Sequence, residues 1–209
     1  MLINQILSGH FDLGMVLAWV VAVTIALTIH EFAHAKVADM VGDPTPRLNG
    51  RVSLNPLDHY DPVGTTMILL FGIGWGKPVP INPQFFKNRR RDEILVSAAG
   101  AGANIIAAAL FALPLRLGFA GVYGEALAFV VFLNLLLAFF NLIPIFPLDG
   151  SHIMQATLSY DAAQRYTAFM SRYGFILLIV LIVTGVLWTI VAIPARLLYY
   201  LFSGHPPFF

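Results

Sequence analysis

The sequence of 209 residues contains no cysteine and few charged residues. Without cysteine, the chain can form no disulfide, no thiolate nucleophile and no cysteine-based zinc site. Charged residues make up 11% of the chain, so they are too few to cover the water-facing surface of an ordinary soluble domain. The 12 basic and 11 acidic residues nearly balance, which leaves no broad basic face for nucleic acid. These absences exclude a soluble domain and a nucleic-acid-binding protein.

Apolar residues are abundant instead. They make up 58% of the chain, and the mean hydropathy is +0.79. A helix needs about 20 apolar residues to cross a bilayer, and four stretches meet this requirement. We predict spans at residues 13–29 (with the helix continuing to 41), 94–113, 126–145 and 173–201.

The expected fold is therefore an all-α polytopic membrane protein with about four transmembrane helices. We expect one membrane-embedded domain over residues 1–209, with its core at about 13–155. The remaining residues, 156–209, are expected to form an amphipathic segment and the last span. A polar segment is predicted at 151–172.

The long connection at residues 42–92 is rich in proline and glycine, which argues against a continuous helix. Short β-strands are predicted at RVSL (51–54) and PVPI (78–81). The apolar piece at 63–74 is too short to span, so we expect a re-entrant or interfacial segment.

Basic residues set the expected orientation, because they concentrate on the cytoplasmic side of membrane proteins. With the 42–92 connection in the cytoplasm, ten of the twelve basic residues lie on that side and only Arg116 and Arg196 on the other. Four spans then place both ends of the chain outside the cytoplasm.

The first predicted span contains the sequence HEFAH, which supplies His30, Glu31 and His34. Ionisable residues within a span are costly and mark functional sites. The two histidines are four residues apart, so they share one helix face and can bind one metal ion. Glu31 beside them can accept a proton from water at the metal. A hydrogen-bonded core histidine is the simpler alternative, but it explains three such residues together poorly.

A catalytic zinc usually has three protein ligands, and Asp149 is the best third candidate. The predicted orientation places it at the same membrane depth as HEFAH, after a helix broken by Pro144 and Pro147. Asp149 as a helix cap is one alternative. His152 is a rival third ligand.

Several motifs together resemble the site-2 protease family of intramembrane zinc metalloproteases (peptidase M50), in its compact prokaryotic branch. They are HEFAH, NLIPIFPLDG (141–150), GRVSLNPLDHYDPVGT (50–65) and GWGKPVPINP (74–83). The resemblance covers about residues 20–155. It implies that His30, His34 and Asp149 bind one Zn²⁺ per chain and that Glu31 is the general base.

The resemblance also points to supporting residues. Asn104 corresponds to the asparagine of a G-P-x-x-N motif that here has Ala101 in place of proline. It is expected to donate a hydrogen bond to the oxyanion, or alternatively to join two helices. His59 corresponds to a family histidine and is read as a gate, a reserve ligand or a plain loop residue. The frame around the third ligand comprises Asn141, which could orient Asp149, Pro144 and Gly150.

The function implied is hydrolysis of peptide bonds in or near the transmembrane segments of other proteins. The partners are then transmembrane substrates and the lipid bilayer, without nucleic acid. The protein is expected in the cell membrane of a prokaryote, with its active site toward the cytoplasm. An unwound substrate could pair with the predicted strands.

Two other classes stay open at this point. A metal-binding transporter or sensor would bind zinc without needing Glu31, and an inactive scaffold would tolerate loss of either histidine. Other proteolytic chemistries fit less well. The chain has no G-x-S-x-G sequence, no cysteine and no G-x-G-D sequence.

Overall fold

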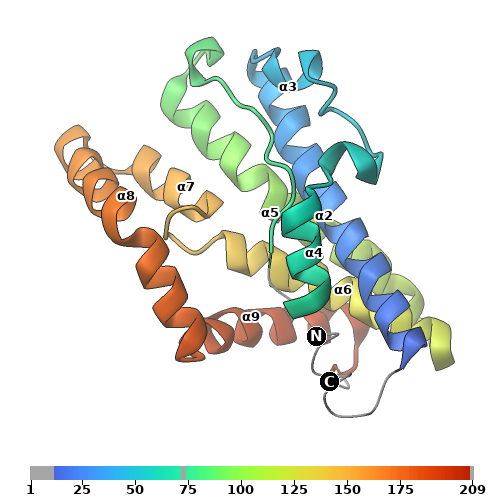
Figure 1. Cartoon of the computed structure of the whole chain (residues 1–209). Helices are drawn as coiled ribbons and strands as arrows, with labels where there is room; N and C mark the ends of the chain where they lie inside the picture. Colours follow the sequence, from blue (N-terminus) through green and yellow to red (C-terminus); the bar gives the residue numbers. More distant parts are fainter. Residues whose placement is uncertain (1–11, 72–73, 208–209) are drawn as a thin grey trace.

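The computed structural model describes residues 12–71 and 74–207 (Figure 1). In these ranges every regular element is a helix, which confirms the all-α prediction. The elements are α2 (Leu13–Val41), α3 (Thr45–Leu48), η1 (Pro56–His59), α4 (Pro62–Phe71), η2 (Pro83–Phe85), α5 (Arg89–Arg116), α6 (Gly121–Asn141), α7 (Asp149–Thr157), α8 (Tyr160–Val183) and α9 (Val186–Ser203).

The helices α2, α5 and α6 pack on one another and form the core. Small residues line their contacts, and Ala108, Ala112 and Ala128 are fully buried. Lipid provides no hydrophobic drive between helices, so close backbone approach through small residues is what holds such a core together. Figure 1 shows α2 and α5 side by side through the centre of the molecule.

The sequence defines both the start and the end of α2. Asp12 caps the first turn by accepting a hydrogen bond from the Met15 amide. Gly42 ends the helix with φ of +115°, a left-handed conformation that glycine adopts without strain. The helix therefore runs through the whole HEFAH sequence, as predicted.

Five helices are long and apolar enough to cross a membrane, by length and composition: α2, α5, α6, α8 and α9. The first three match the predicted spans. The prediction of four spans is wrong at the C-terminal end, where a polar segment at 151–172 and one span at 173–201 were expected. The chain instead breaks at Gly185, which has φ of +76°, and Pro194 lies inside α9. Glycine takes the positive φ readily, whereas proline is tolerated in membrane helices.

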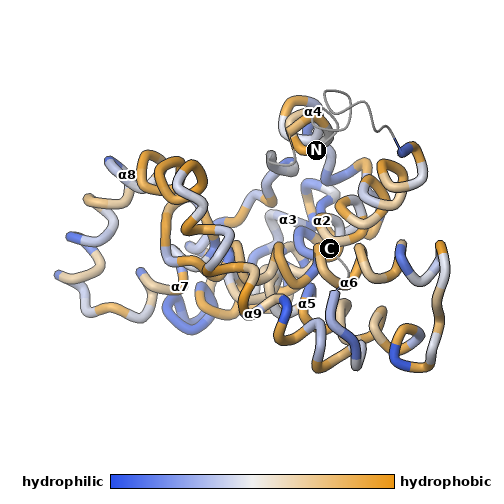
Figure 2. The backbone as a smooth tube through the Cα atoms, turned by 90° about the horizontal axis from the view of Figure 1, so that it is seen from below, coloured by the Kyte–Doolittle hydropathy of each residue, from blue (hydrophilic) through white to orange (hydrophobic). Residues whose placement is uncertain are grey.

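The apolar side chains of α8 and α9 point largely outward. Of α8, Gly174 and Leu178 are buried, while residues such as Phe175, Ile176 and Val180 are about half exposed or more. Figure 2 shows hydrophobic residues running along both helices. This outer surface fits contact with lipid.

The predicted strands at 51–54 and 78–81 are wrong, since the described part of the connection contains none. The buried Arg51 guanidinium explains why. It donates hydrogen bonds to the carbonyls of Pro78 (2.9 Å) and Lys77, so these carbonyls cannot pair with another strand. Pro78 and Pro80 have no amide hydrogen to contribute.

The apolar piece predicted at 63–74 forms α4, a helix of ten residues. This helix is not among the candidate spans. The chain then folds back on the helix. A Cβ on Gly64 would lie 2.1 Å from the Trp75 carbonyl oxygen, and one on Gly74 would lie 2.1 Å from the Gly64 carbonyl oxygen. This return is compatible with a re-entrant or interfacial segment, and the choice between the two stays a prediction. Residues 72–73 of the predicted segment lie outside the described residues.

Candidate metal centre

His30, His34 and Asp149 meet in the core. The Nε2 atoms of the two histidines are 3.0 Å apart, and each lies 3.1 Å from Oδ2 of Asp149. The histidines come from successive turns of α2, and Asp149 is the first residue of α7. Both imidazoles are buried, while Asp149 is partly accessible. The structure therefore brings the three predicted ligands to one point.

The segment after α6 delivers Asp149. The helix ends at Asn141, and short backbone hydrogen bonds fold the next residues into turns, including one from Leu148 N to Ile145 O. Gly150 is needed here, because a Cβ would lie 2.3 Å from the Leu142 carbonyl oxygen. The Pro144 carbonyl accepts a hydrogen bond from the Tyr166 hydroxyl at 2.9 Å, which ties this segment to α8.

The other nitrogen of each imidazole faces an oxygen. His30 Nδ1 is 2.7 Å from Oδ1 of Asn104, and His34 Nδ1 is 2.7 Å from the Val96 carbonyl. Both oxygens are acceptors, so both rings carry their hydrogen on Nδ1. The Nε2 lone pairs then point toward each other and toward the carboxylate of Asp149. A cation placed between these three atoms could accept a lone pair from each of them.

A tetrahedral zinc ion fits this donor set. Ligand atoms about 2.0–2.1 Å from zinc are about 3.3 Å apart at the tetrahedral angle, close to the distances of 3.0–3.1 Å here. Two imidazoles and one carboxylate leave a fourth position for water. Gly100 on α5 makes room for the rings, since a Cβ there would lie 2.4 Å from His34 Nε2. Sequence reasoning assigned no site role to Gly100.

The side-chain amides of Asn104 and Asn141 donate to partners other than the predicted ones, which were the oxyanion and Asp149. Both amide hydrogens of Asn104 are used, toward the carbonyl of Ala26 and Oδ1 of Asn134. Among the described residues, the Asn141 amide donates to Leu137 O rather than to Asp149. The predicted roles of Asn104 at the oxyanion and of Asn141 beside Asp149 stay predictions.

Glu31 follows His30 on α2 and is partly exposed. Burial lowers the pKa of the Arg51 guanidinium, and the negative charges of Glu31 and Asp58 oppose this shift. Arg51 nevertheless remains protonated near neutral pH. The Glu31 carboxylate thus lies within electrostatic reach of a buried cation of the connection.

The other two histidines considered as site residues, His59 and His152, lie outside the cluster. His59 is buried, accepts a hydrogen bond from Arg51 at Nδ1 and donates one from Nε2 to Ser53 O. Both of its ring nitrogens are therefore engaged, which favours a structural role over a reserve ligand. His152 is exposed and lies 3.9 Å from Glu93.

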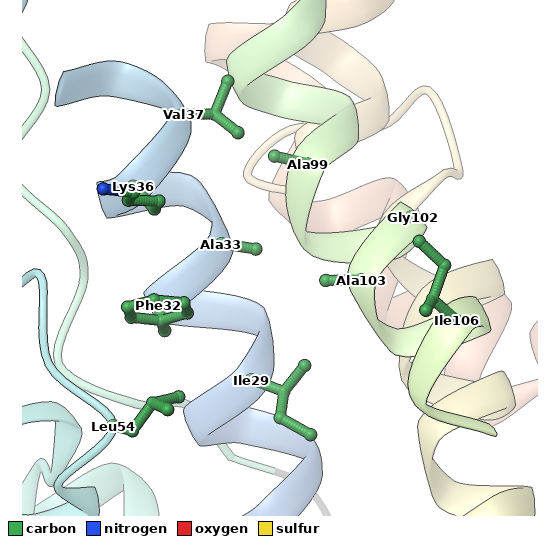
Figure 3. Close-up of a pocket in the computed structure, with 10 residues that line it drawn as sticks. All are labelled: Ile29, Phe32, Ala33, Lys36, Val37, Leu54, Ala99, Gly102, Ala103 and Ile106. Atoms are coloured by element: carbon green, nitrogen blue, oxygen red, sulfur yellow. The ribbon is translucent and has the colours of Figure 1, made fainter. Parts of the chain in front are cut away.

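A groove of about 530 Å³ lies on another side of α2, between α2 and α5 (Figure 3). Each helix residue advances by about 100°, so Phe32 and Lys36 in this groove point well away from the face of His30 and His34. None of the three predicted ligands His30, His34 and Asp149 is among the residues that line the groove. Its lining residues are Ile29, Phe32, Ala33, Lys36, Val37, Leu54, Ala99, Gly102, Ala103 and Ile106.

Fold and site together define a helical membrane protein with a buried His–His–carboxylate centre. The profile of Peptidase family M50 matches residues 116–181. The chain is 36% identical over 193 residues to "Putative zinc metalloprotease YwhC" of Bacillus subtilis, with 86% of this chain and 88% of that protein covered. It is 31% identical over 202 residues to "Putative zinc metalloprotease Rip2" of Mycolicibacterium smegmatis, with 83% and 76% covered. The chain therefore belongs to peptidase family M50.

This membership confirms the resemblance inferred from the motifs. The chain is 33% identical over 166 residues to the protein of the same name from Mycobacterium tuberculosis (strain ATCC 25618 / H37Rv), with 75% of this chain and 63% of that protein covered. No solved structure gives a significant match.

Proposed function

We propose that the chain is an intramembrane zinc endopeptidase that hydrolyses peptide bonds in or near the membrane-spanning segments of other proteins. The convergence of two Nε2 atoms and one carboxylate oxygen within 3.1 Å carries this proposal. Membership of peptidase family M50 and the five candidate spans support it.

The proposed site holds one Zn²⁺ per chain through His30, His34 and Asp149. When bound, zinc polarises a carbonyl and lowers the pKa of a water molecule to about 7. Glu31 supplies the proton transfer: its carboxylate takes the proton of the attacking water and passes it to the leaving nitrogen. Its partial exposure beside His30 supports this role, since water must reach the base.

The contacts of Asn104 favour a role in holding His30, because its amide hydrogens are already engaged. Donation to an oxyanion would require the amide to leave one of these partners. The substrate must also unwind, since a helix hides its carbonyls in hydrogen bonds. Pairing with strands at 51–54 and 78–81 is no longer proposed, because those strands are not formed.

We place the protein in the cell membrane of a prokaryote, with the metal centre toward the cytoplasmic end of α2. The basic residues at and just before the start of α5 support this orientation. A Cβ on Gly42, which ends α2, would lie 3.9 Å from Lys87 Cε, and Arg89, Arg90 and Arg91 follow within the first turn of α5. The single domain over residues 1–209 remains part of the proposal. The bacterial relatives support the prokaryotic assignment.

The test combines metal content with cleavage in detergent-purified protein. Wild type should contain about one zinc per chain, and His34→Ala and Asp149→Ala should lose it. Glu31→Gln should keep zinc but cleave a single-span model substrate with a helix-breaking sequence on the order of 10²–10⁴-fold more slowly. Unchanged function in Glu31→Gln would favour a metal-binding transporter or sensor, and wild type without zinc would contradict the proposed site.

A further inference from the structure

We propose that Asn134 is a positioning residue that orients the metal ligand His30 through Asn104. It acts from α6, the third helix of the core, without touching the metal centre itself. The inference rests on the proposed metal site and assigns a role to a residue that sequence reasoning passed over.

Four hydrogen bonds form a chain from α6 across α5 to α2. The Asn134 amide donates to the Val130 carbonyl of its own helix at 2.8 Å, and its Oδ1 accepts from Asn104 Nδ2 at 2.8 Å. Asn104 Nδ2 also donates to Ala26 O at 2.9 Å, and Asn104 Oδ1 accepts from His30 Nδ1 at 2.7 Å. Asn104 and Asn134 are both fully buried.

Each bond in this chain fixes the direction of the next. The Asn134 amide group faces its own backbone, so its oxygen faces Asn104. Asn134 Oδ1 and the Ala26 carbonyl oxygen are both acceptors, so the NH₂ group of Asn104 must face them. The Asn104 oxygen is then left for His30, which must carry its hydrogen on Nδ1. The Nε2 lone pair of His30 is thereby directed toward His34 and Asp149.

A reversed Asn104 side chain would place its oxygen against two acceptors: Asn134 Oδ1 would lose its donor, and the Ala26 carbonyl, already bonded within α2, would face a second oxygen. Buried polar groups without partners are strongly disfavoured, so Asn134 and Ala26 together exclude the reversed orientation. Without Asn134, one of these two constraints is lost.

The second histidine shows why only His30 needs such a chain. His34 Nδ1 donates to the Val96 carbonyl, and a backbone carbonyl within a helix cannot rotate. An amide side chain can exchange its oxygen and nitrogen by rotation. The structure thus adds a further residue at the ligand whose partner could otherwise reverse.

The variant Asn134→Leu removes the acceptor at similar volume. Direct hydrogen-bond partners of metal-ligating histidines typically contribute 10–100-fold to metal affinity, so this more distant residue should contribute roughly threefold to tenfold. We expect the Kd for Zn²⁺, from competition with a chelating dye, to rise by that factor. Asn134→Asp should stay within about twofold of wild type, because a protonated buried carboxyl can replace both amide bonds.

A structural role alone would not change the histidine tautomer, so this is the second readout. In metal-free protein labelled with ¹⁵N-histidine, NMR should show His30 and His34 both with hydrogen on Nδ1 in wild type. In Asn134→Leu, the His30 signal should become a mixture while that of His34 stays unchanged. Asn134→Ala serves the same purpose if the leucine variant does not fold.

Thr24→Val is the matched control. Thr24 donates a hydrogen bond within α2 to Val20 O and takes no part in the hydrogen bonds that link Asn134, Asn104 and His30. It should leave both the zinc Kd and the tautomers unchanged. Wild-type zinc affinity and an unchanged His30 tautomer in Asn134→Leu would overturn this inference alone. A wild-type protein that binds no zinc would overturn the proposed function as well.

Discussion

Of the two C-terminal helices, α9 packs on the core through Ala195 and Tyr199, whereas α8 differs from the core helices in how little it buries. Within the apolar 18-residue stretch of each helix, 39% is buried in α6 but only 11% in α8. The core encloses polar side chains such as His30, Asn104 and Asn134, and their hydrogen bonds link α2, α5 and α6. The core therefore specifies one arrangement of helices, as a metal site with narrow distance limits requires.

The C-terminal pair is attached mainly by apolar contacts. Leu178 of α8 and Leu187 of α9 pack with Ile145 and Leu148, beside the segment that delivers Asp149. The backbone of Gly174 lies against Phe146. The helices around the metal centre are thus held by hydrogen bonds between polar side chains and by contacts of small residues. The outer helix α8 is held by apolar packing.

The largest effect should come from adding one methyl group to the core at Gly100. In Gly100→Ala, the Cβ would lie 2.4 Å from His34 Nε2 and 2.6 Å from His30 Cε1. A ligand displaced by about 1 Å leaves coordination distance, so zinc affinity should fall by roughly 100-fold or more. The measurement is the zinc Kd by dye competition.

Gly102→Ala is the control, since a Cβ there meets nothing within 4 Å. Alanine favours helix over glycine by about 1 kcal/mol, so this variant should bind zinc normally and melt no lower than wild type. Normal zinc affinity in Gly100→Ala would show that the core tolerates more displacement than the structure indicates.

A smaller effect is expected from the connection, which extends the comparison to a third region. Arg51→Met removes the donor to Lys77 O, Pro78 O and His59. Of these acceptors only His59 is buried, while Lys77 and Pro78 are exposed, so leaving them unpaired should lower the free energy of unfolding by about 1–2 kcal/mol. We would measure the melting temperature in detergent and proteolytic cleavage within the connection.

The control for Arg51 is Arg47→Met, because the exposed Arg47 guanidinium pairs, within residues 12–71 and 74–207, only with Asp39, at 3.0 Å. Such surface pairs contribute about 0–1 kcal/mol. Equal melting temperatures of the two variants would contradict a special role for the buried guanidinium.

The smallest effect is expected in the outer part of the molecule. In Gly174→Ala, the Cβ would lie 3.0 Å from the Phe146 carbonyl oxygen, so α8 must shift by a few tenths of an ångström. We expect a change in unfolding free energy of no more than about 1 kcal/mol and a zinc Kd within about twofold of wild type. A tenfold loss of zinc affinity would mean that α8 controls the metal centre, and the contrast between core and periphery would fail.

The sequence was sufficient to predict that His30, His34 and Asp149 lie together, because ionisable side chains in an apolar helix are conspicuous. His30 and His34 share a helix face by spacing alone, and Asp149 follows a proline-broken span. The same reasoning could have found Asn134, a polar residue within the predicted span at 126–145. The space at Gly100 could not be predicted, because it depends on how closely α5 approaches α2.

The errors in the predicted fold have physical causes as well. The polar residues at 151–172 suggested a surface segment, but most of them continue into the apolar run of α8 as one helix. The break falls at Gly185, where backbone freedom outweighs hydropathy. The residues at 51–54 and 78–81 have the composition of strands, but the long-range bonds of Arg51 occupy the carbonyls that pairing would need.

The position of the ligands along α2 also sets a depth. His34 lies seven residues before the end of the helix at Val41, which corresponds to about 10 Å at 1.5 Å per residue. An extended chain covers about 10 Å with three residues. On the proposed function, a substrate that enters in extended form from that end would present to the metal centre a bond about three residues beyond the level of Val41.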